Sequence, residues 1–298
     1  MAEHPQQIER IRALIEGDGP LDVAGSRALC RAITNAAGSS FAVGIRLTPA
    51  RCRDGMHAVY AWMRLADDAA DADAAPDERG DLLARFESLT LQTLDGQVPP
   101  RSIWPALSAA VAERAIERGW LEGLLAGVRQ DVGPIAFEAE GQLDEYCDRV
   151  AGNVGRCCVA IWGVRAGVDR EQALALAGLR GRAFQCINIA RDIADDARAG
   201  RRYVPRQRLD RLGVELHDPA VREDLLRQAM AMLDQSAALS GMVRPDAAPA
   251  LWAMTRAYTL IAHRLRRRGA RVSLGGGAKL GIAAGAIGRR VLAAGRLA

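Results

Sequence analysis

The sequence lacks the features of membrane-spanning, secreted and zinc-binding proteins. No uncharged apolar stretch reaches the roughly 18 residues that a membrane-spanning helix needs. Residues 1–7 lack the basic and apolar segments of a signal peptide. The six cysteines form no Cys-x-x-Cys motif and no His/Cys spacing suited to zinc. These absences predict a cytoplasmic protein whose thiols are buried and reduced.

No charge of one sign is in large excess either. The chain has 40 Lys and Arg against 36 Asp and Glu, a formal net charge of +4. Such a balance gives no reason to expect nucleic acid as a partner. The last apolar stretch is interrupted by Arg289, Arg290 and Arg296, which predicts an amphipathic C-terminal helix at about residues 278–298. This helix is expected to close the core, and peripheral membrane association is the alternative.

Aromatic residues are also scarce, at 4%, and the Val/Ile/Thr alternation of strands is missing. Ala, Leu, Arg and Glu are abundant, which predicts one helix after another. With 298 residues, 49% of them apolar, and no internal Pro/Gly/Ser linker, we expect a single all-α domain over residues 1–298. Two predicted helices matter for function: one follows Thr48-Pro49 and runs through Asp71, and one spans about residues 170–198.

Each of these two helices carries a pair of aspartates four residues apart, which places both carboxylates on one face. The pairs are Asp67 with Asp71 and Asp192 with Asp196, and Asn188 lies one turn before Asp192. Like charges at this spacing repel unless a cation lies between them. A solvated acidic surface explains either pair alone, but two pairs in apolar helices favour Mg²⁺, which prefers carboxylate oxygens.

Arginines accompany both acidic pairs and indicate the class of substrate. Arg64 lies one turn before Asp67, and Arg191 is next to Asp192. A bare metal site does not need them, whereas a metal-bound diphosphate accepts paired hydrogen bonds from arginine. Iron is disfavoured because di-iron bundles use Glu-x-x-His pairs, and the four histidines lie outside both clusters.

Four motifs occur in the order in which squalene and phytoene synthases carry theirs. They are Gly-Ser-Ser-Phe at 38–41, Tyr-Ala-Trp-Met-Arg leading into Asp-Asp-x-x-Asp at 60–71, Tyr-Cys-Asp-Arg-Val-Ala-Gly-Asn-Val-Gly at 146–155, and Ala-Phe-Gln through Gly-Arg-x-Tyr-Val-Pro at 183–205. The chain therefore resembles the squalene/phytoene synthase family, with a family-like core at about residues 22–280.

The resemblance implies an isoprenoid synthase helical bundle with a central hydrophobic cavity. It also implies head-to-head joining of two prenyl diphosphates with two or three Mg²⁺ ions. The metal ligands that it implies are Asp67, Asp71, Asn188, Asp192 and Asp196. The catalytic residues are Arg64, Asp67, Asp71, Tyr146, Arg191, Asp192 and Asp196, and the substrate-binding residues are Ser40, Phe41, Tyr60, Gln185, Asn188 and Tyr203.

The motifs leave the product open. Cys147-Asp148-Arg149 with Gly155-Arg156 resembles bacterial presqualene diphosphate synthases of the hopanoid branch, whereas residues 188–192 resemble bacterial phytoene synthases. We favour a reaction that joins two farnesyl diphosphates to presqualene diphosphate without NADPH. Later isoprenoid enzymes are the expected functional partners. The alternatives are a phytoene or dehydrosqualene synthase using farnesyl or geranylgeranyl diphosphate, another class I isoprenoid synthase such as a chain-elongating prenyltransferase or a terpene cyclase, or a non-catalytic helical assembly factor of the same fold. The last should have lost its acidic ligands, which this chain retains.

Overall fold

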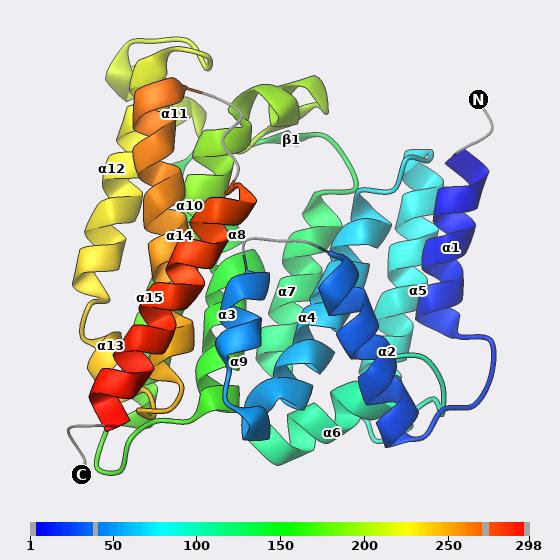
Figure 1. Ribbon diagram of the computed structural model, residues 1–298. Helices are drawn as coiled ribbons and strands as arrows, with labels where there is room; N and C mark the ends of the chain where they lie inside the picture. The colour runs from blue at the N-terminus through cyan, green and yellow to red at the C-terminus, as the bar shows by residue number, and fades with distance from the viewer. Residues whose placement is uncertain (1–3, 38–40, 270–273, 295–298) are drawn as a thin grey trace. The chain divides into compact units, whose positions relative to one another are not determined.

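Helices dominate the protein, as its composition predicts (Figure 1). The computed structural model describes residues 4–37, 41–269 and 274–294. It is 75% helical, and its two strands, β1 (Ile135–Ala136) and β2 (Arg201–Arg202), have two residues each. The prediction of an all-α protein is confirmed.

The described chain divides into two compact units. The first unit contains Met1–Gly38 and Ala50–Gly133, and the second contains Ser39–Pro49 and Pro134–Ala298. Each unit is described by itself below. The single domain over residues 1–298 and the central cavity that the resemblance implies both stay predictions.

In the first unit, five helices pack around α4. Trp62 of α4 is fully buried, with its ring centre 5.9 Å from that of Phe86, which lies 5.3 Å from that of Trp104. The Trp62 indole N–H donates to the hydroxyl of Thr90 at 3.0 Å, so its one polar group is satisfied inside the core. The helices of this unit are α1 (His4–Glu16), α2 (Val23–Ala36), α4 (Ala50–Ala70), α5 (Pro76–Leu94), α6 (Trp104–Arg114) and α7 (Arg118–Gln130).

The helix predicted after Thr48-Pro49 is α4, and it ends one residue earlier than expected. Asp71 lies just beyond its last residue, Ala70. The Asp71 backbone N–H still donates to the Asp67 carbonyl at 2.9 Å, so the four-residue helical spacing of these two aspartates holds.

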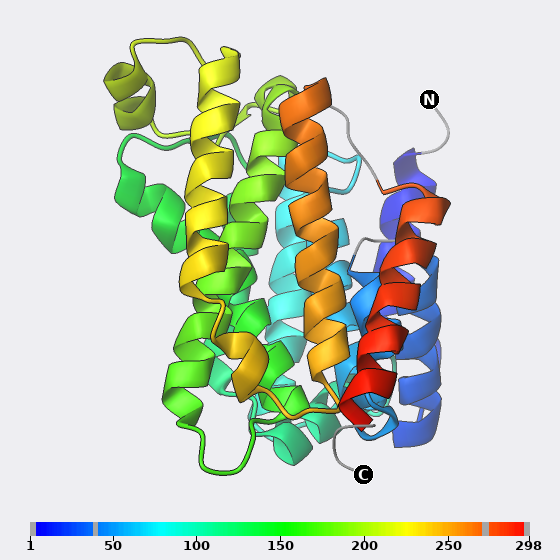
Figure 2. The same cartoon turned by 60° about the vertical axis from the view of Figure 1, so that its left-hand side comes forward.

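In the second unit, α10 is the central helix and contacts α8, α9, α12, α13 and α14. Figure 2 shows α12 and α14 running beside it, and α15 beside α14. The helices are α3 (Ala42–Leu47), α8 (Glu140–Cys147), a π-helical turn η1 (Asp148–Gly152), α9 (Asn153–Trp162), α10 (Arg170–Arg198), α11 (Arg206–Leu212), α12 (Pro219–Gln235), α13 (Leu239–Met242), α14 (Ala248–Arg268) and α15 (Gly276–Ala294).

The bounds predicted for α10 are confirmed, and the helix approaches its neighbours unusually closely. Asp169 caps its N-terminus by accepting from the backbone N–H of Glu171 at 2.9 Å. Glycine allows the close contact with η1: a Cβ on Gly181 would lie 2.1 Å from the carbonyl oxygen of Ala151. The backbone of α10 therefore packs directly against the segment that carries the third motif.

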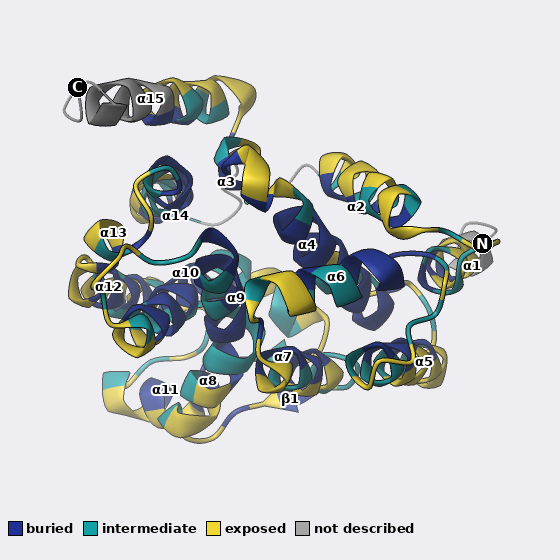
Figure 3. Ribbon diagram, turned by 90° about the horizontal axis from the view of Figure 1, so that it is seen from below, coloured by how far each residue is buried: buried dark blue, intermediate teal, exposed yellow. Residues whose placement is uncertain are grey.

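The C-terminal helix predicted for residues 278–298 is α15, which begins two residues earlier. In its described part, Ile282 and Ala286 are buried, whereas Leu280 is 74% exposed. Figure 3 shows the corresponding contrast in the rest of the chain, with α4 and α10 mostly buried and α2 and α5 partly exposed. Among the described helices, none is both long and apolar enough to span a bilayer.

Candidate functional site

The first acidic cluster lies in the last turns of α4. Arg64 donates to the carboxylate of Asp68, with its Nε 3.1 Å from Oδ2 and its Nη2 2.6 Å from Oδ1. Asp67 lies in the same turn, and the residue as a whole is exposed. Helical spacing thus gathers Arg64, Asp67 and Asp68, with Asp71 at the helix end.

A raised pKa marks Asp67 as the unusual residue of this cluster. Loss of hydration raises the pKa of Asp67 to about 7, and repulsion from Asp71, Asp131 and Asp68 adds to the rise. Because the residue as a whole is exposed, contact with water offsets part of the first effect. Asp131, at the end of α7, was not predicted, because nothing in the local sequence connects it with Asp67, which lies 64 positions earlier in the chain.

The second acidic cluster lies on α10. Arg191 forms two hydrogen bonds with Asp192, from Nε to Oδ1 at 2.8 Å and from Nη2 to Oδ2 at 2.5 Å. The hydrogen bonds to Asp192 raise the pKa of Arg191. Asn188 lies one turn before Asp192 and Gln185 lies two turns before it. The Asn188 amide donates to the Gln185 side-chain oxygen at 3.2 Å. The predicted polar stripe on this helix is therefore present.

The carboxylates of both clusters are chemically suited to binding a divalent cation. They offer hard oxygen donors, and a cation would relieve the repulsion from neighbouring carboxylates that adds to the raised pKa of Asp67. Within residues 4–37, 41–269 and 274–294, no group of three or more His, Cys, Asp or Glu side chains is arranged to hold a metal ion. Mg²⁺ characteristically completes its shell with water and phosphate oxygens, so a diphosphate would have to supply ligands here.

Three aromatic rings form a compact cluster in the second unit. Tyr146 and Tyr203 stack with ring centres 4.8 Å apart, and Phe137 contacts both, at 5.7 and 5.9 Å. Parallel pairing of β1 with β2 brings them together: the N–H of Phe137 donates to the carbonyl of Arg202 at 3.1 Å. Both tyrosines were predicted from the motifs, but Phe137 lies outside the motifs and was missed.

A second aromatic pair lies close to the α10 cluster. The rings of Phe184 and Tyr258 are parallel, with an interplanar angle of 7° and centres 4.0 Å apart. Tyr258, on α14, also interacts electrostatically with Arg191. Tyr258 was not predicted, because no motif includes it and it comes close to Arg191 only through the packing of α14 against α10.

The remaining predicted substrate residues are placed as follows. Tyr60 lies in the buried middle of α4, in the first unit. Phe41 precedes α3 in the second unit and is partly exposed. Ser40 lies outside the described residues.

The residues of the third motif that bear on the product form a small hydrogen-bonded cluster. The Arg156 guanidinium spans the π-helical turn and binds both oxygens of Asp148, at 2.9 and 3.1 Å. The same guanidinium donates to the side-chain oxygen of Asn153 at 2.8 Å. Arg156 therefore binds the Asp148 carboxylate and the Asn153 side-chain oxygen, while the Asn153 amide donates to the backbone carbonyl of Arg149 at 3.1 Å.

A sequence model described as squalene/phytoene synthase matches residues 34–283 of the chain. The chain belongs to the squalene/phytoene synthase family. Members of this family are prenyltransferases that join two prenyl diphosphates head to head, so the chain is classed as an enzyme of this type.

Named relatives divide between two products. A 15-cis-phytoene synthase of Paracoccus sp. is 33% identical over 82% of this chain and 84% of its own length. A presqualene diphosphate synthase of Sinorhizobium fredii is 36% identical over 68% of this chain and 72% of its own length. These relatives therefore agree on the family and differ in the product that their names give.

Solved structures support the squalene/phytoene synthase fold. A dehydrosqualene synthase in complex with a ligand matches with a TM-score of 0.79 and 24% identity, covering 89% of this chain and 96% of that one. A squalene synthase from Alicyclobacillus acidocaldarius matches with a TM-score of 0.73 and 25% identity, covering 86% of this chain and 98% of that one.

Proposed function

We propose that the protein condenses two farnesyl diphosphates head to head to presqualene diphosphate, with Mg²⁺ as its cofactor. The observation that carries the proposal is the repeated combination of an acidic cluster with an arginine that already binds one of its carboxylates. Arg64 with Asp68 on α4 and Arg191 with Asp192 on α10 are the two cases. Family membership supports the use of both clusters in one reaction.

The chain's own residues would bind and orient the two diphosphates. Asp67 and Asp71 on α4, and Asn188, Asp192 and Asp196 on α10, would hold two or three Mg²⁺ ions, which would supply positive charge to the departing diphosphate. Arg64 and Arg191 would donate hydrogen bonds to the diphosphate oxygens and stabilise the charge that develops as the C–O bond breaks.

Loss of diphosphate leaves an allylic cation, which needs protection from water. The double bond of the second prenyl chain attacks this cation, and loss of a proton closes the cyclopropane ring. The buried faces of Tyr60, Tyr146 and Tyr203 are suited to this environment, because aromatic rings attract a cation and exclude water. Gln185 and Phe41 belong to the same proposal as substrate-binding residues.

The choice of presqualene diphosphate rests on the third motif. Asp148 and Arg156, two of the residues that carry the resemblance to presqualene diphosphate synthases, are joined as an ion pair across η1. The second candidate is a phytoene synthase acting on geranylgeranyl diphosphate. The wider match to the Paracoccus enzyme, over 82% of this chain, favours that candidate.

The deciding experiment incubates the purified protein and Mg²⁺ with radiolabelled farnesyl or geranylgeranyl diphosphate, with and without NADPH. We expect a diphosphate product from farnesyl diphosphate that phosphatase converts to a cyclopropyl alcohol, whether or not NADPH is present. A C40 hydrocarbon from geranylgeranyl diphosphate would instead establish the second candidate. Excess EDTA should stop either reaction, and full activity in EDTA would refute the role of the cation.

The product would pass to later isoprenoid enzymes, and α15 is the element that would touch a membrane surface. Its Leu280 is 74% exposed. Cosedimentation with vesicles containing anionic lipid, comparing the unaltered protein with Leu280→Asp, tests this part of the proposal. Equal recovery of both proteins in the pellet would show that α15 plays no part.

A further inference from the structure

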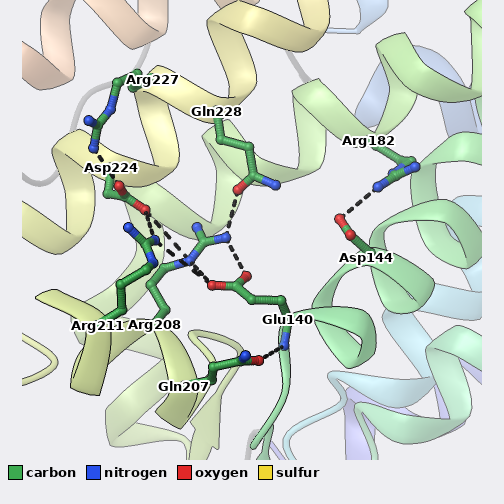
Figure 4. A network of polar contacts seen from close by, with 9 residues as sticks. All are labelled: Glu140, Asp144, Arg182, Gln207, Arg208, Arg211, Asp224, Arg227 and Gln228. Carbon is green, nitrogen blue, oxygen red and sulfur yellow. Dashed lines mark hydrogen bonds and ion pairs between the residues drawn. The ribbon is translucent and has the colours of Figure 1, made fainter.

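Arg208, in α11, lies at the centre of a polar network (Figure 4). Its side chain is only 3% exposed and forms two hydrogen bonds with Glu140 of α8, from Nε to Oε1 at 2.8 Å and from Nη2 to Oε2 at 2.5 Å. Nη2 also donates to the side-chain oxygen of Gln228 of α12 at 2.7 Å. One guanidinium therefore joins the consecutive helices α11 and α12 to α8, which lies 68 positions earlier in the chain.

Asp224 of α12 completes the network on the other side of Arg208. Its carboxylate lies 3.7 Å from Arg208 Nε, accepts a hydrogen bond from Arg211 at 2.9 Å, and is paired with Arg227. The Asp224 side chain is only 10% exposed. Two carboxylates thus face the guanidinium of Arg208, and additional arginines balance their charge.

Stability alone does not explain this arrangement. Arg208 Nη1 is buried and has no hydrogen-bond partner in the described part of the chain. An unpaired buried donor is unfavourable, and apolar side chains of similar volume often stabilise a protein as well as a buried ion pair does. What apolar packing cannot supply is the fixed orientation of two parallel hydrogen bonds.

The Arg208–Glu140 pair joins the two segments that carry the stacked tyrosines. Glu140 is the first residue of α8, whose last turn contains Tyr146, and Arg208 follows Tyr203 by five residues. Next to the pair, the backbone N–H of Glu140 donates to the Gln207 side-chain oxygen at 3.0 Å. Tyr203 therefore lies between β2 and Arg208 in its segment, and in the other segment Glu140 lies between β1 and Tyr146, so the ion pair is a second link between the two segments besides the β1–β2 pairing.

We infer that Arg208 is a positioning residue: its two hydrogen bonds to Glu140 hold Tyr203 against Tyr146 and so fix the aromatic surface against which a prenyl chain lies. Arg208 itself touches neither substrate nor diphosphate. The inference rests on the proposed function, which gives the two tyrosines their role. It adds a residue outside the four motifs to those on which turnover depends.

Arg208→Lys is the informative variant, because lysine keeps the charge but cannot form two parallel hydrogen bonds. We expect kcat to fall by about 10- to 100-fold with little change in KM, since misplacing a surface near the reacting carbons mainly affects the chemical step. Arg206→Lys is the matched control. Arg206 lies on the same helix, and its 2.8 Å bond to Asp210 is exposed, so this variant should keep the activity of the unaltered protein.

A second measurement does not depend on turnover. The chain has four tyrosines, so protein labelled with fluorotyrosine should give four ¹⁹F resonances. Arg208→Lys should shift those of Tyr146 and Tyr203 and leave those of Tyr60 and Tyr258 in place, whereas Arg206→Lys should shift none. Should Arg208→Lys fail to fold, Glu140→Gln provides a second way to break the paired geometry, because it keeps the shape but replaces one of the two accepting oxygens with an NH2 donor.

The double variant Arg208→Lys/Glu140→Gln should lose no more activity than the more damaged single variant, because both changes break the same contact. Additive losses, or a folded Arg208→Lys variant with unchanged kcat and unchanged tyrosine resonances, would overturn the inference. Absence of product from the unaltered protein with either prenyl diphosphate would instead refute the proposed function, and the ¹⁹F comparison would still decide whether Arg208 positions the tyrosines.

Discussion

The guanidinium of Arg191 forms two hydrogen bonds with the carboxylate of Asp192, its neighbour in the chain, at 2.8 and 2.5 Å. Arg64 holds Asp68 in the same way one turn apart on α4. On α10, the proposed cation would therefore share the oxygens of Asp192 with Arg191, whereas on α4 Arg64 binds Asp68 and not the proposed ligand Asp67. A diphosphate would relieve the competition at Asp192, because its oxygens can accept hydrogen bonds from the arginine and coordinate the cation.

Asp192→Asn is expected to lower kcat/KM by roughly 100-fold or more, because it removes charge that the proposed cation needs. The concentration of Mg²⁺ that gives half-maximal rate should rise as well. Steady-state assays across a range of Mg²⁺ concentrations measure both effects. Asp195→Asn is the control, since Asp195 is on the same helix but exposed and paired with Arg198. Equal rates for the two variants would exclude a special role for Asp192.

The raised pKa of Asp67 predicts how stability depends on pH. The native state binds this proton more tightly than the unfolded chain, so ionisation of Asp67 weakens the fold as the pH rises from the ordinary carboxyl range towards about 7. Asp67→Asn should therefore raise the melting temperature of the metal-free protein more at about pH 8 than at about pH 5.

Thermal unfolding followed by circular dichroism tests this prediction, with Asp234→Asn, an exposed position on α12, as the control. Mg²⁺ with diphosphate should raise the melting temperature of the unaltered protein more than that of Asp67→Asn, because a bound ligand stabilises only the state that binds it. A larger gain for Asp67→Asn at the lower pH would contradict the direction of the pKa shift.

The contact of α10 with η1 predicts a strong effect of a single methyl group. Gly181→Ala would place a Cβ 2.1 Å from the backbone oxygen of Ala151, which cannot move without shifting the helix. The expected loss of unfolding free energy is at least about 1–3 kcal/mol. Gly80→Ala is the control: no atom lies within 4 Å of its added Cβ, and alanine in α5 should stabilise by about 0.5–1 kcal/mol. Denaturant unfolding of both variants decides the point.

The buried thiols should resist alkylation in the native protein. Burial raises the pKa of Cys30 and of Cys158 to about 12, so almost no reactive thiolate exists at neutral pH. Iodoacetamide should label both residues only after denaturation, as peptide mass spectrometry would show. Fast labelling of either in the folded protein would mean that the surrounding core opens readily.

Local sequence determined the helical elements and the contents of each acidic cluster. The predicted bounds of α10, residues 170–198, agree with the structure, and Asp67 and Asp71 keep the spacing of one helical turn. Both results depend on the helical repeat, which is fixed by backbone hydrogen bonds within a few residues. The prediction that the six cysteines are buried and free is also confirmed, because an apolar pattern with no metal spacing leaves few other uses for a thiol.

Tertiary structure alone decided which distant residues meet. Phe137 joins Tyr146 and Tyr203 only because β1 pairs with β2, and Asp131 affects Asp67 only because α7 packs on α4. Arg208 binds Glu140, which lies 68 positions earlier in the chain. Such contacts depend on how the elements pack on one another. The helical period of a segment indicates which of its faces is buried, but not which distant residues that face meets.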